Sequence, residues 1–378
     1  MAENLKQTLG YFNVVGTISV DSKCFAMNTP SKNNANWIMN TFNPRVDGDN
    51  GEGLYMRFSD GYDKVKGKTI FAQSTTDTNL EIPFADRNNP NMIKLVNDKS
   101  FIRVGIGKKT EKNEKGQEYK IWDYKKFLTL FDAITFLNQV MPLASKNKVR
   151  ITGRIKFSEY KGETQRNFEL QSIYLLNNNE EPDKIASSEF TFTQNILVDE
   201  TSINRDKWDT EGVATINSKL YVKKKKDVYQ VLPLELTVRA DTEDKKAKYE
   251  KVLNKYLTAK EGKIRRVNIE GIFNSGYVAG KVTEEDLPQE AKDLIEDGIY
   301  SKEEVMNLYA NKDKVDEMLL KRPVVKKGED GKILVDMDDE EFKPEDLENL
   351  ETILPQETTE IIEDTQVTDD LLSELEGL

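Results

Sequence analysis

A short segment occurs twice in this sequence, and it constrains the fold more than any other feature. Residues 149–157 read Val-Arg-Ile-Thr-Gly-Arg-Ile-Lys-Phe, and residues 267–273, which begin 118 positions later, read Val-Asn-Ile-Glu-Gly-Ile-Phe. Apolar residues at alternate positions are typical of a strand with one buried face. The glycine at the same place in both copies, Gly153 and Gly271, predicts a strand that bends sharply or that another backbone approaches closely.

Each copy follows a segment with the periodicity of a helix. Apolar residues recur at helical spacing in residues 125–141 and again in residues 243–257. A short basic connector separates each predicted helix from its glycine-containing strand. Because helix, connector and bent strand occur twice in this order, we interpret the chain as two copies of one small β-barrel module.

Alternating apolar residues predict the remaining strands of the two modules. They occur at residues 11–20, 54–58, 101–106 and 167–176 in the first module, and at residues 190–198, 213–223 and 228–239 in the second. Residues 177–188, which are rich in Asn, Glu and Ser, predict a linker. We therefore place the first module at residues 1–178 and the second at residues 188–282.

The chain beyond residue 282 has a different composition. Residues 288–296 and 301–320 are predicted helices, so we expect a helical extension over residues 283–322. From Ile333 to the end, 17 acidic residues stand against one lysine. Such a composition buries too little apolar surface to fold alone, and it predicts an acidic, disordered tail over residues 323–378.

Charge is distributed unevenly along the chain. Residues 283–378 contain 31 acidic and 10 basic residues, whereas residues 1–282 contain 45 basic and 36 acidic residues. The body is therefore basic, with a net charge of +9, although the whole chain has a net charge of −12. A basic body with an acidic end suggests nucleic-acid binding with a built-in competitor. A solvated surface followed by a disordered end is the alternative.

The absence of histidine excludes several classes of enzyme. Ser-His-Asp and Cys-His catalysis, histidine general bases and histidine-containing zinc sites all need this residue. Carboxylate chemistry with magnesium or manganese stays open, but we expect no catalytic residues, no metal and no cofactor. The single cysteine, Cys24, fits a reducing, cytoplasmic setting, and we find no apolar run long enough to cross a membrane.

Aromatic and basic residues recur together on the strand faces opposite the predicted core. Sequence-tolerant binding of single strands needs rings on which bases stack and cations that hold phosphates. The residues that we predict to contact DNA are Tyr55, Arg57, Phe101, Arg103, Trp122, Tyr124, Arg150, Arg154 and Lys156 in the first module, and Lys219, Tyr221, Lys223, Lys224, Lys225, Lys226, Arg265 and Arg266 in the second. Core packing is the alternative for the aromatic residues, and a solvated hairpin tip is the alternative for the four lysines.

Parts of the chain resemble single-stranded-DNA-binding proteins with the OB-fold. Residues 148–176 are similar to the last two barrel strands of that family, and Val14-Val15-Gly16-Thr17-Ile18 is similar to its first strand. The resemblance covers residues 10–176, more faintly residues 188–282, and the acidic C-terminus by composition. It implies a mainly β chain with some α structure, made of two OB-fold-like five-stranded barrels, each with a helix before its fourth strand.

Two modules with an acidic tail look most like the phage-encoded versions of this family. The resemblance therefore implies non-catalytic binding of single-stranded DNA during phage DNA replication, recombination or repair, in the host cytoplasm. We expect the tail to compete with DNA and to recruit a polymerase, helicase or primase. The tail residues expected to bind such partners are Asp369, Asp370, Leu371, Leu372, Leu375 and Leu378. The bacterial members end in an aromatic residue after proline, whereas this chain ends at Leu378, so the partners of the tail stay open.

Two other classes of protein stay open as alternatives. One is a structural or interaction protein, such as a virion component or an inhibitor whose acidic tail mimics DNA. The other is a metal-dependent nuclease or a strand-annealing recombination protein.

Overall fold

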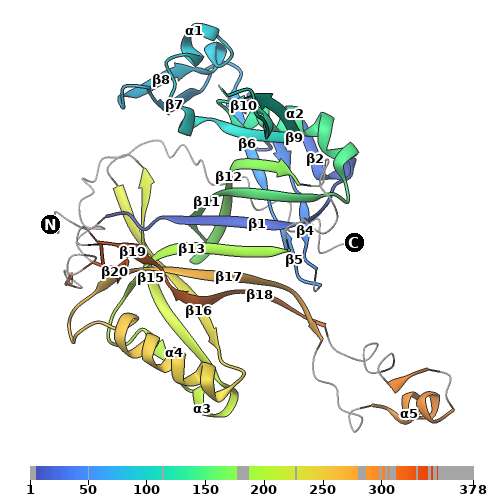
Figure 1. Ribbon diagram of the computed structural model, residues 1–378, viewed down its shortest axis with the longest axis vertical. Coiled ribbons are helices and arrows are strands. Elements are labelled where there is room, and N and C mark those ends of the chain that lie inside the picture. The colour runs from blue at the N-terminus through green and yellow to red at the C-terminus, as the bar shows by residue number, and fades with distance from the viewer. Residues whose placement is uncertain are drawn as a thin grey trace.

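The computed structural model describes residues 6–49, 51–112, 115–176, 187–225, 228–279, 287–297, 300–302, 305, 312–328, 331–338, 342–343 and 347. These residues form a mainly β structure with few helices, in which one sheet of 13 strands runs through both halves of the chain. At its centre, β1 (Gly10–Ser19) pairs antiparallel with β13 (Glu189–Val198), and the two strands lie side by side in Figure 1. Phe12 stands directly opposite Phe192 in this pair, and a single apolar core contains residues of both halves.

The second half is a closed five-stranded barrel. After β13 come β15 (Val213–Lys225), β16 (Val228–Arg239), the helix α4 (Glu243–Tyr256), β17 (Arg265–Ala279) and β18 (Lys312–Pro323). The strands pair in the closed order β13-β15-β16-β18-β17-β13, and only the β16–β18 pair is parallel. This order, with a helix before the fourth strand, is that of the OB-fold. Two short elements, β14 (Ile203–Asn204) and α3 (Trp208–Glu211), lie in the connection from β13 to β15.

The first half repeats four of these five strands and the helix, but within the described residues no strand pairs with both β1 and β9 (Ile102–Lys112) in the place of β15. β1, β9, the helix α2 (Leu130–Ala144), β11 (Lys148–Tyr160) and β12 (Glu163–Leu175) take the places of β13, β16, α4, β17 and β18. The correspondence includes the parallel pair, here formed by β12 and β9. An additional strand, β10 (Glu118–Phe127), pairs with β9 at the edge of the sheet.

The part of the chain that connects β1 to β9 forms smaller groups of strands. β2 (Phe25–Pro30), β3 (Trp37–Phe42) and β6 (Phe58–Asp63) form a three-stranded sheet, while β4 (Arg45–Asp47) and β5 (Gly53–Tyr55) attach to the end of β1. β7 (Thr69–Gln73) and β8 (Asn79–Pro83) form a hairpin, followed by the short helix α1 (Pro90–Ile93). Single 3-10 turns occupy Ser22–Cys24, Phe84–Asp86 and Asp98–Ser100.

Phenylalanine rings of the central strand pair pack against the two repeated glycines. Gly153 lies opposite Phe12, and Gly271 lies opposite Phe192. A Cβ on Gly153 would stand 1.8 Å from the carbonyl oxygen of Glu169, and a Cβ on Gly271 would stand 2.3 Å from Cζ of Phe192. At both glycines the register with the next strand also shifts by one residue. A Cβ on Gly271 would also stand 2.3 Å from the carbonyl oxygen of Leu319, so the predicted close approach of another backbone is confirmed in both copies.

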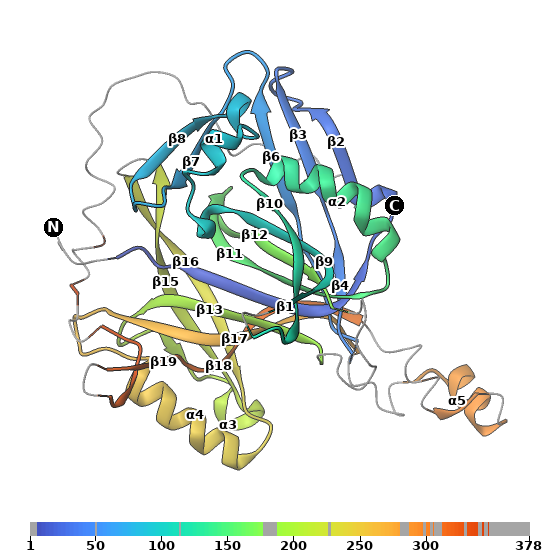
Figure 2. The ribbon, with the colours of Figure 1, turned by 45° about the horizontal axis from the view of Figure 1, so that its top comes forward.

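The two main helices begin in the same way. The side-chain oxygen of Thr129 accepts a hydrogen bond from the backbone N–H of Asp132, and that of Thr242 accepts one from Lys245, which satisfies an N–H that the helix itself leaves free. Figure 2 shows α2 beside β3 and β6, and α4 at the opposite end of the molecule. The helix predicted from residue 125 begins only at Leu130, because residues 118–127 form β10.

Two predictions for the region beyond residue 282 are wrong. Residues 312–320, predicted as part of a helix, belong to β18, so the second barrel takes its fifth strand from the predicted helical extension. The start of the predicted disordered tail is folded as well. β19 (Val325–Lys327) and β20 (Ile333–Val335) form a hairpin, and Phe342 exchanges backbone hydrogen bonds with Ile264.

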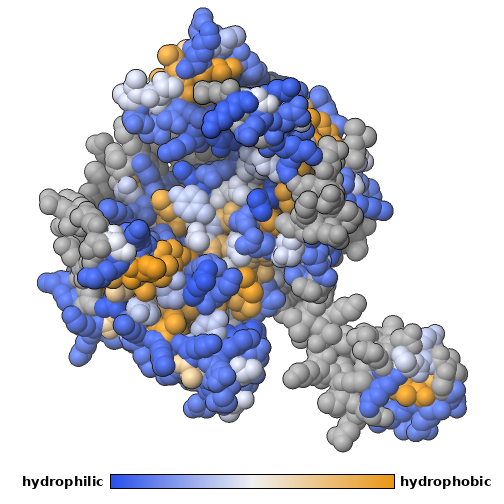
Figure 3. All heavy atoms as spheres, in the orientation of Figure 1, coloured by the Kyte–Doolittle hydropathy of each residue, from blue (hydrophilic) through white to orange (hydrophobic). Residues whose placement is uncertain are grey.

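The helix predicted over residues 288–296 is present as α5 (Gln289–Glu296). It contributes to a small apolar cluster of its own, formed by Leu287, Ala291, Ile295 and Val305. This cluster stands apart from the body of the molecule in Figure 1 and Figure 3. Residues 348–378, with the predicted partner-binding end of the tail, lie outside the described residues.

The close contact at the repeated glycine leads to a test of stability. Replacing Gly153 with Ala should lower the free energy of unfolding by about 1–3 kcal/mol, because the added methyl group forces the backbone of Glu169 or the ring of Phe12 to move. Gly107→Ala in β9 is the matched control, since no atom lies within 4 Å of its added Cβ. Urea unfolding of both variants measures the difference. Equal stability of the two variants would contradict the proposed role of the glycine.

Candidate nucleic-acid interface

An outer face of the first half collects aromatic and basic side chains from four adjacent strands. Arg150 of β11 lies opposite Tyr174 of β12, Tyr174 lies beside Gly105 of β9, and Gly105 lies opposite Tyr124 of β10. Directly neighbouring residues of paired strands point to the same face. The next row along the same face brings Ser172, Arg103 and Lys126 together in the same way. We call this surface the platform, and its members are Arg103, Lys108, Trp122, Tyr124, Lys126, Arg150 and Tyr174.

The rings of the platform are close to one another and to cations. The centroids of Trp122 and Tyr174 are 5.1 Å apart at an interplanar angle of 49°. The Nζ of Lys108 lies 5.0 Å from the centroid of Trp122, and that of Lys126 lies 5.7 Å from the centroid of Tyr124. Glycine at position 105 makes room for this arrangement, because a Cβ there would stand 2.2 Å from Cδ1 of Tyr174.

One carboxylate sits among the cations of the platform. Asp98 accepts hydrogen bonds from Lys126 and from Nη2 of Arg103, the latter at 2.5 Å. The bond from Lys126, followed by that from Arg103, lowers the pKa of Asp98 below its ordinary value. Asp98 therefore stays charged at neutral pH. It pairs there with Arg103 and Lys126, two cations that would otherwise be available to an anionic ligand.

The structure brings four of the predicted DNA-contacting residues of the first half together on the platform, namely Arg103, Trp122, Tyr124 and Arg150. Arg154 is exposed farther along β11, on the same side of the strand, and Lys156 beyond it pairs with Glu169 at 2.5 Å. The outward orientation predicted for Phe101 is wrong. Its ring is only 7% exposed, because it packs in the apolar cluster beneath the β7–β8 hairpin.

Tyr221 in the second half is a further correction. It lies on the outer side of β15, as predicted, yet its side chain is only 7% exposed. Its ring stacks on Tyr229, with centroids 4.8 Å apart and an interplanar angle of 15°, and both belong to an apolar cluster with Ile264. Leu197, Phe342 and Leu347 belong to the same cluster, so the C-terminal segment packs in the apolar cluster that contains this ring. Burial, followed by the proximity of Tyr229, raises the pKa of Tyr221.

The predicted cations of the second half are spread over a wider area. Lys219 pairs with Asp199 at 3.1 Å, and Arg266 pairs with Asp338 at 2.9 Å. Arg265 is half-buried beside Arg266 in β17. Lys223 and Lys224 are exposed at the tip of β15, while the side chain of Lys225 and all of Lys226 lie outside the described residues.

The counterpart of the platform in the second half holds the acidic C-terminal segment. Asn268 has the position of Arg150, three residues before the repeated glycine. Its side-chain Nδ2 donates to Asp336 Oδ2 at 2.9 Å, and its backbone N–H donates to the carbonyl oxygen of Asp336, also at 2.9 Å. Burial alone would raise the pKa of Asp336, but the bonds from Asn268 and Lys326 bring it below its ordinary value. The fold is duplicated, whereas the chemistry of this face is not.

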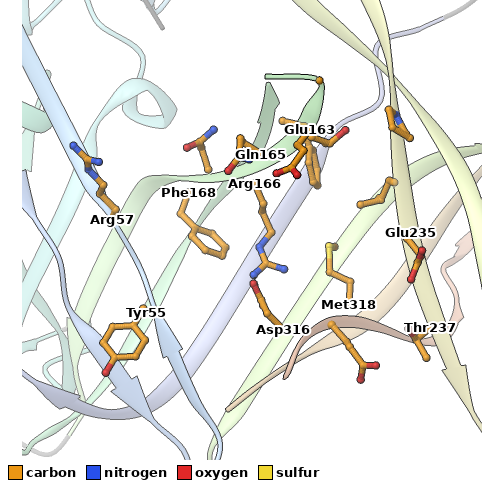
Figure 4. Close-up of a pocket in the computed structure, with 17 residues that line it drawn as sticks. Tyr55, Arg57, Glu163, Gln165, Arg166, Phe168, Glu235, Thr237, Asp316 and Met318 are labelled. Carbon is orange, nitrogen blue, oxygen red and sulfur yellow. The ribbon is translucent and has the colours of Figure 1, made fainter. Parts of the chain in front are cut away.

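Tyr55 and Arg57 lie away from the platform, in a groove of about 680 Å³ between the halves. We call it the inter-half groove, and it is lined by Tyr55, Arg57, Phe157, residues 162–168, residues 233–235, Thr237 and residues 316–318. Figure 4 shows Arg166 and Asp316 pointing toward one another across it, and their side chains pair at 2.7 Å. Burial lowers the pKa of Arg57.

Comparison with known proteins finds likeness in structure but no match in sequence. No family model matches the chain, and no curated protein matches it. A solved structure of a deletion mutant of the single-stranded DNA binding protein from Thermus aquaticus is 9% identical to this chain. It aligns over 71% of this chain and 89% of its own, with a TM-score of 0.30. The assignment of the barrel therefore rests on the strand order and pairings given above.

Within the described residues, no helix is long and apolar enough to cross a membrane. In the same part of the chain, no three cysteine, aspartate or glutamate side chains gather in a group that could hold a metal ion.

Proposed function

We propose that this protein binds single-stranded DNA with little sequence preference, and that the DNA lies on the platform. The observation that carries this proposal is the group formed by Trp122, Tyr124 and Tyr174, with Lys108 and Lys126 over the rings. Rings interleaved with cations on an open sheet are what stacked bases and their phosphates need.

The geometry favours an unpaired strand over a duplex. Stacking on a side-chain ring requires a base whose face is free, and bases inside a duplex already stack on their neighbours. Three of the four strands of the platform supply a cation beside the rings, namely Arg103 on β9, Lys126 on β10 and Arg150 on β11. The strand can therefore keep its phosphates near positive charge while its bases reach the rings.

The biological setting is part of the same proposal. We place the protein in the replication, recombination or repair of phage DNA in the host cytoplasm, without catalysis of its own. The resemblance of residues 10–176 and the acidic C-terminus support this setting. Recruitment of a polymerase, helicase or primase by the last residues of the tail remains a prediction.

The acidic C-terminal segment competes with DNA in this proposal. Its folded part already packs among predicted DNA-contacting residues, since Asp338 pairs with Arg266 and Phe342 lies in the same apolar cluster as Tyr221. Within residues 333–378 the net charge is −16, which adds electrostatic competition for the basic body. A DNA strand that extends from the platform onto the second half must displace this segment.

Loss of a platform ring should weaken binding to an oligothymidylate. We expect Trp122→Ala to reduce affinity about 5- to 150-fold, which corresponds to about 1–3 kcal/mol for one stacked base. Phe71→Ala is the matched control, because this ring is 74% exposed on β7 and contributes nothing to the platform. Fluorescence anisotropy at fixed salt measures both. An equal loss in the two variants would contradict the assignment.

The salt dependence of binding tests the role of the cations. The logarithm of the association constant should fall linearly with the logarithm of salt concentration, with a slope of about −0.7 for each phosphate neutralised. Replacing both Arg103 and Arg150 with Gln should make the slope shallower by about 1.4. A flat response of the unmodified protein would rule out the proposed phosphate contacts.

Removing the carboxylate on the platform should strengthen binding. In the Asp98→Asn variant, Arg103 and Lys126 no longer face a competing negative charge, so we expect affinity for oligothymidylate to rise about threefold. Glu81→Gln, which removes an exposed charge on β8, serves as the control and should change affinity little. Weaker or unchanged binding by Asp98→Asn would count against the platform.

Deletion of residues 333–378 should raise DNA affinity about fivefold or more, since it frees Arg266 and removes Phe342 from the apolar cluster of Tyr221. A shorter deletion, of residues 348–378, retains Phe342 and Leu347 and removes 10 acidic residues. It separates charge competition from occlusion, because only the longer deletion removes residues of that apolar cluster. Titration of both with the same oligothymidylate is the measurement. Unchanged or weaker binding by the longer deletion would contradict the proposed competition between the C-terminal segment and DNA.

A further inference from the structure

The inter-half groove differs from the platform in charge. Its lining contains two arginines and four carboxylates, those of Glu163, Glu235, Asp316 and Glu317. Arg166 is held by Asp316, and Glu317 is held by Arg239 at 2.6 Å. Within the described residues, Glu163 and Glu235 have no ion pair. The lining therefore carries more negative than positive groups, which favours cationic over anionic ligands, although the body of the protein is basic.

The rings of the groove already lie beside guanidinium groups. Arg45 lies over Tyr55, with Cζ 5.2 Å from the ring centroid, and Arg166 lies 5.6 Å from the centroid of Phe168. Tyr55 is nevertheless 67% exposed, so one side of its ring is open to a further cation. Apolar surface lies next to these groups, because Phe157 and Pro233 also line the groove.

The groove and the platform lie on opposite sides of the β11–β12 pair. Phe157 lies two residues from the buried Ile155, and Phe168 lies two residues from the buried Leu170. Each phenylalanine is therefore on the inner face of its strand. Arg150 is out of phase with them and points to the outer side of β11. A ligand in the groove and a DNA strand on the platform therefore need not exclude one another.

We propose that the inter-half groove binds an extended segment of a partner protein that carries lysine or arginine beside aliphatic residues. The cationic groups meet Glu163, Glu235 and the open side of Tyr55, and the aliphatic groups meet the apolar lining. A volume of about 680 Å³ falls within the range of sites that enclose a short ligand. The hydroxyl of Thr164 has no hydrogen-bond partner within the described part of the chain and is available to the backbone of such a segment. This inference goes beyond DNA binding and does not depend on it.

The test uses the full chain and a fluorescein-labelled peptide of alternating lysine and leucine. We expect the double variant Glu163→Gln, Glu235→Gln to weaken peptide binding about fivefold, and Tyr55→Ala to weaken it about threefold without any change of charge. The matched control is Asp209→Asn with Glu211→Gln on α3, which alters the net charge equally at an exposed site outside the groove. Attraction of the peptide to the acidic tail is the same in every variant, so the difference between variants isolates the groove.

Three outcomes decide the proposal. A loss for the groove variants and not for the control, with no binding of a glutamate–leucine peptide, supports it. An equal loss in the groove and control variants would overturn it, because binding would then depend on net charge alone. A loss of oligothymidylate affinity in the groove variants would also overturn it, since the groove would then belong to the DNA path. If the platform variants do not change DNA binding, the peptide test of the groove is unaffected. The proposals for DNA binding and for peptide binding can therefore be refuted independently.

Discussion

The pairing of β1 with β13 is the interaction on which the rest of the structure depends. Phe12 and Phe192 stand opposite one another in this pair, and each ring fills the space that a glycine leaves in the next strand. Phe168 and Phe273 extend the contact, with ring centroids 5.6 Å apart, so the cores of the two halves merge. A side chain larger than hydrogen at either glycine would separate the layers that this contact joins.

This central pair also determines which faces remain open. Because the first strands of the two halves lie side by side, the β11–β12 arm of the first half faces β16 and β18 of the second across the inter-half groove. The opposite side of the same arm forms part of the platform. The second half has the corresponding strands, but Asn268 and the acidic segment replace the cation and ring found in the first half. The two halves therefore share a strand order, but the side chains on the corresponding faces differ in charge and in aromatic content.

The local pattern of the sequence predicts the duplicated strands, both main helices and the rings of β10. Trp122 and Tyr124 alternate within a single strand, so their shared face is visible without any knowledge of the fold. Tyr174 also alternates with core residues, and this signal could have identified it. Residues 312–320 of β18 are predicted as a helix because their apolar residues fit both periods, and only the need of the barrel for a fifth strand decides between them. Tyr221 is buried in a cluster that includes Phe342, 121 residues away, and local periodicity carries no information about such long-range packing.

The central claim, that unpaired DNA lies on the platform, is tested most directly by ultraviolet crosslinking of oligothymidylate to the full chain. Mass spectrometry of the digested complex then identifies the crosslinked peptides. The account predicts crosslinks at Trp122, Tyr124 or Tyr174, and these should disappear with a duplex of the same length. Crosslinks confined to Tyr55 and Phe168 in the inter-half groove would contradict it.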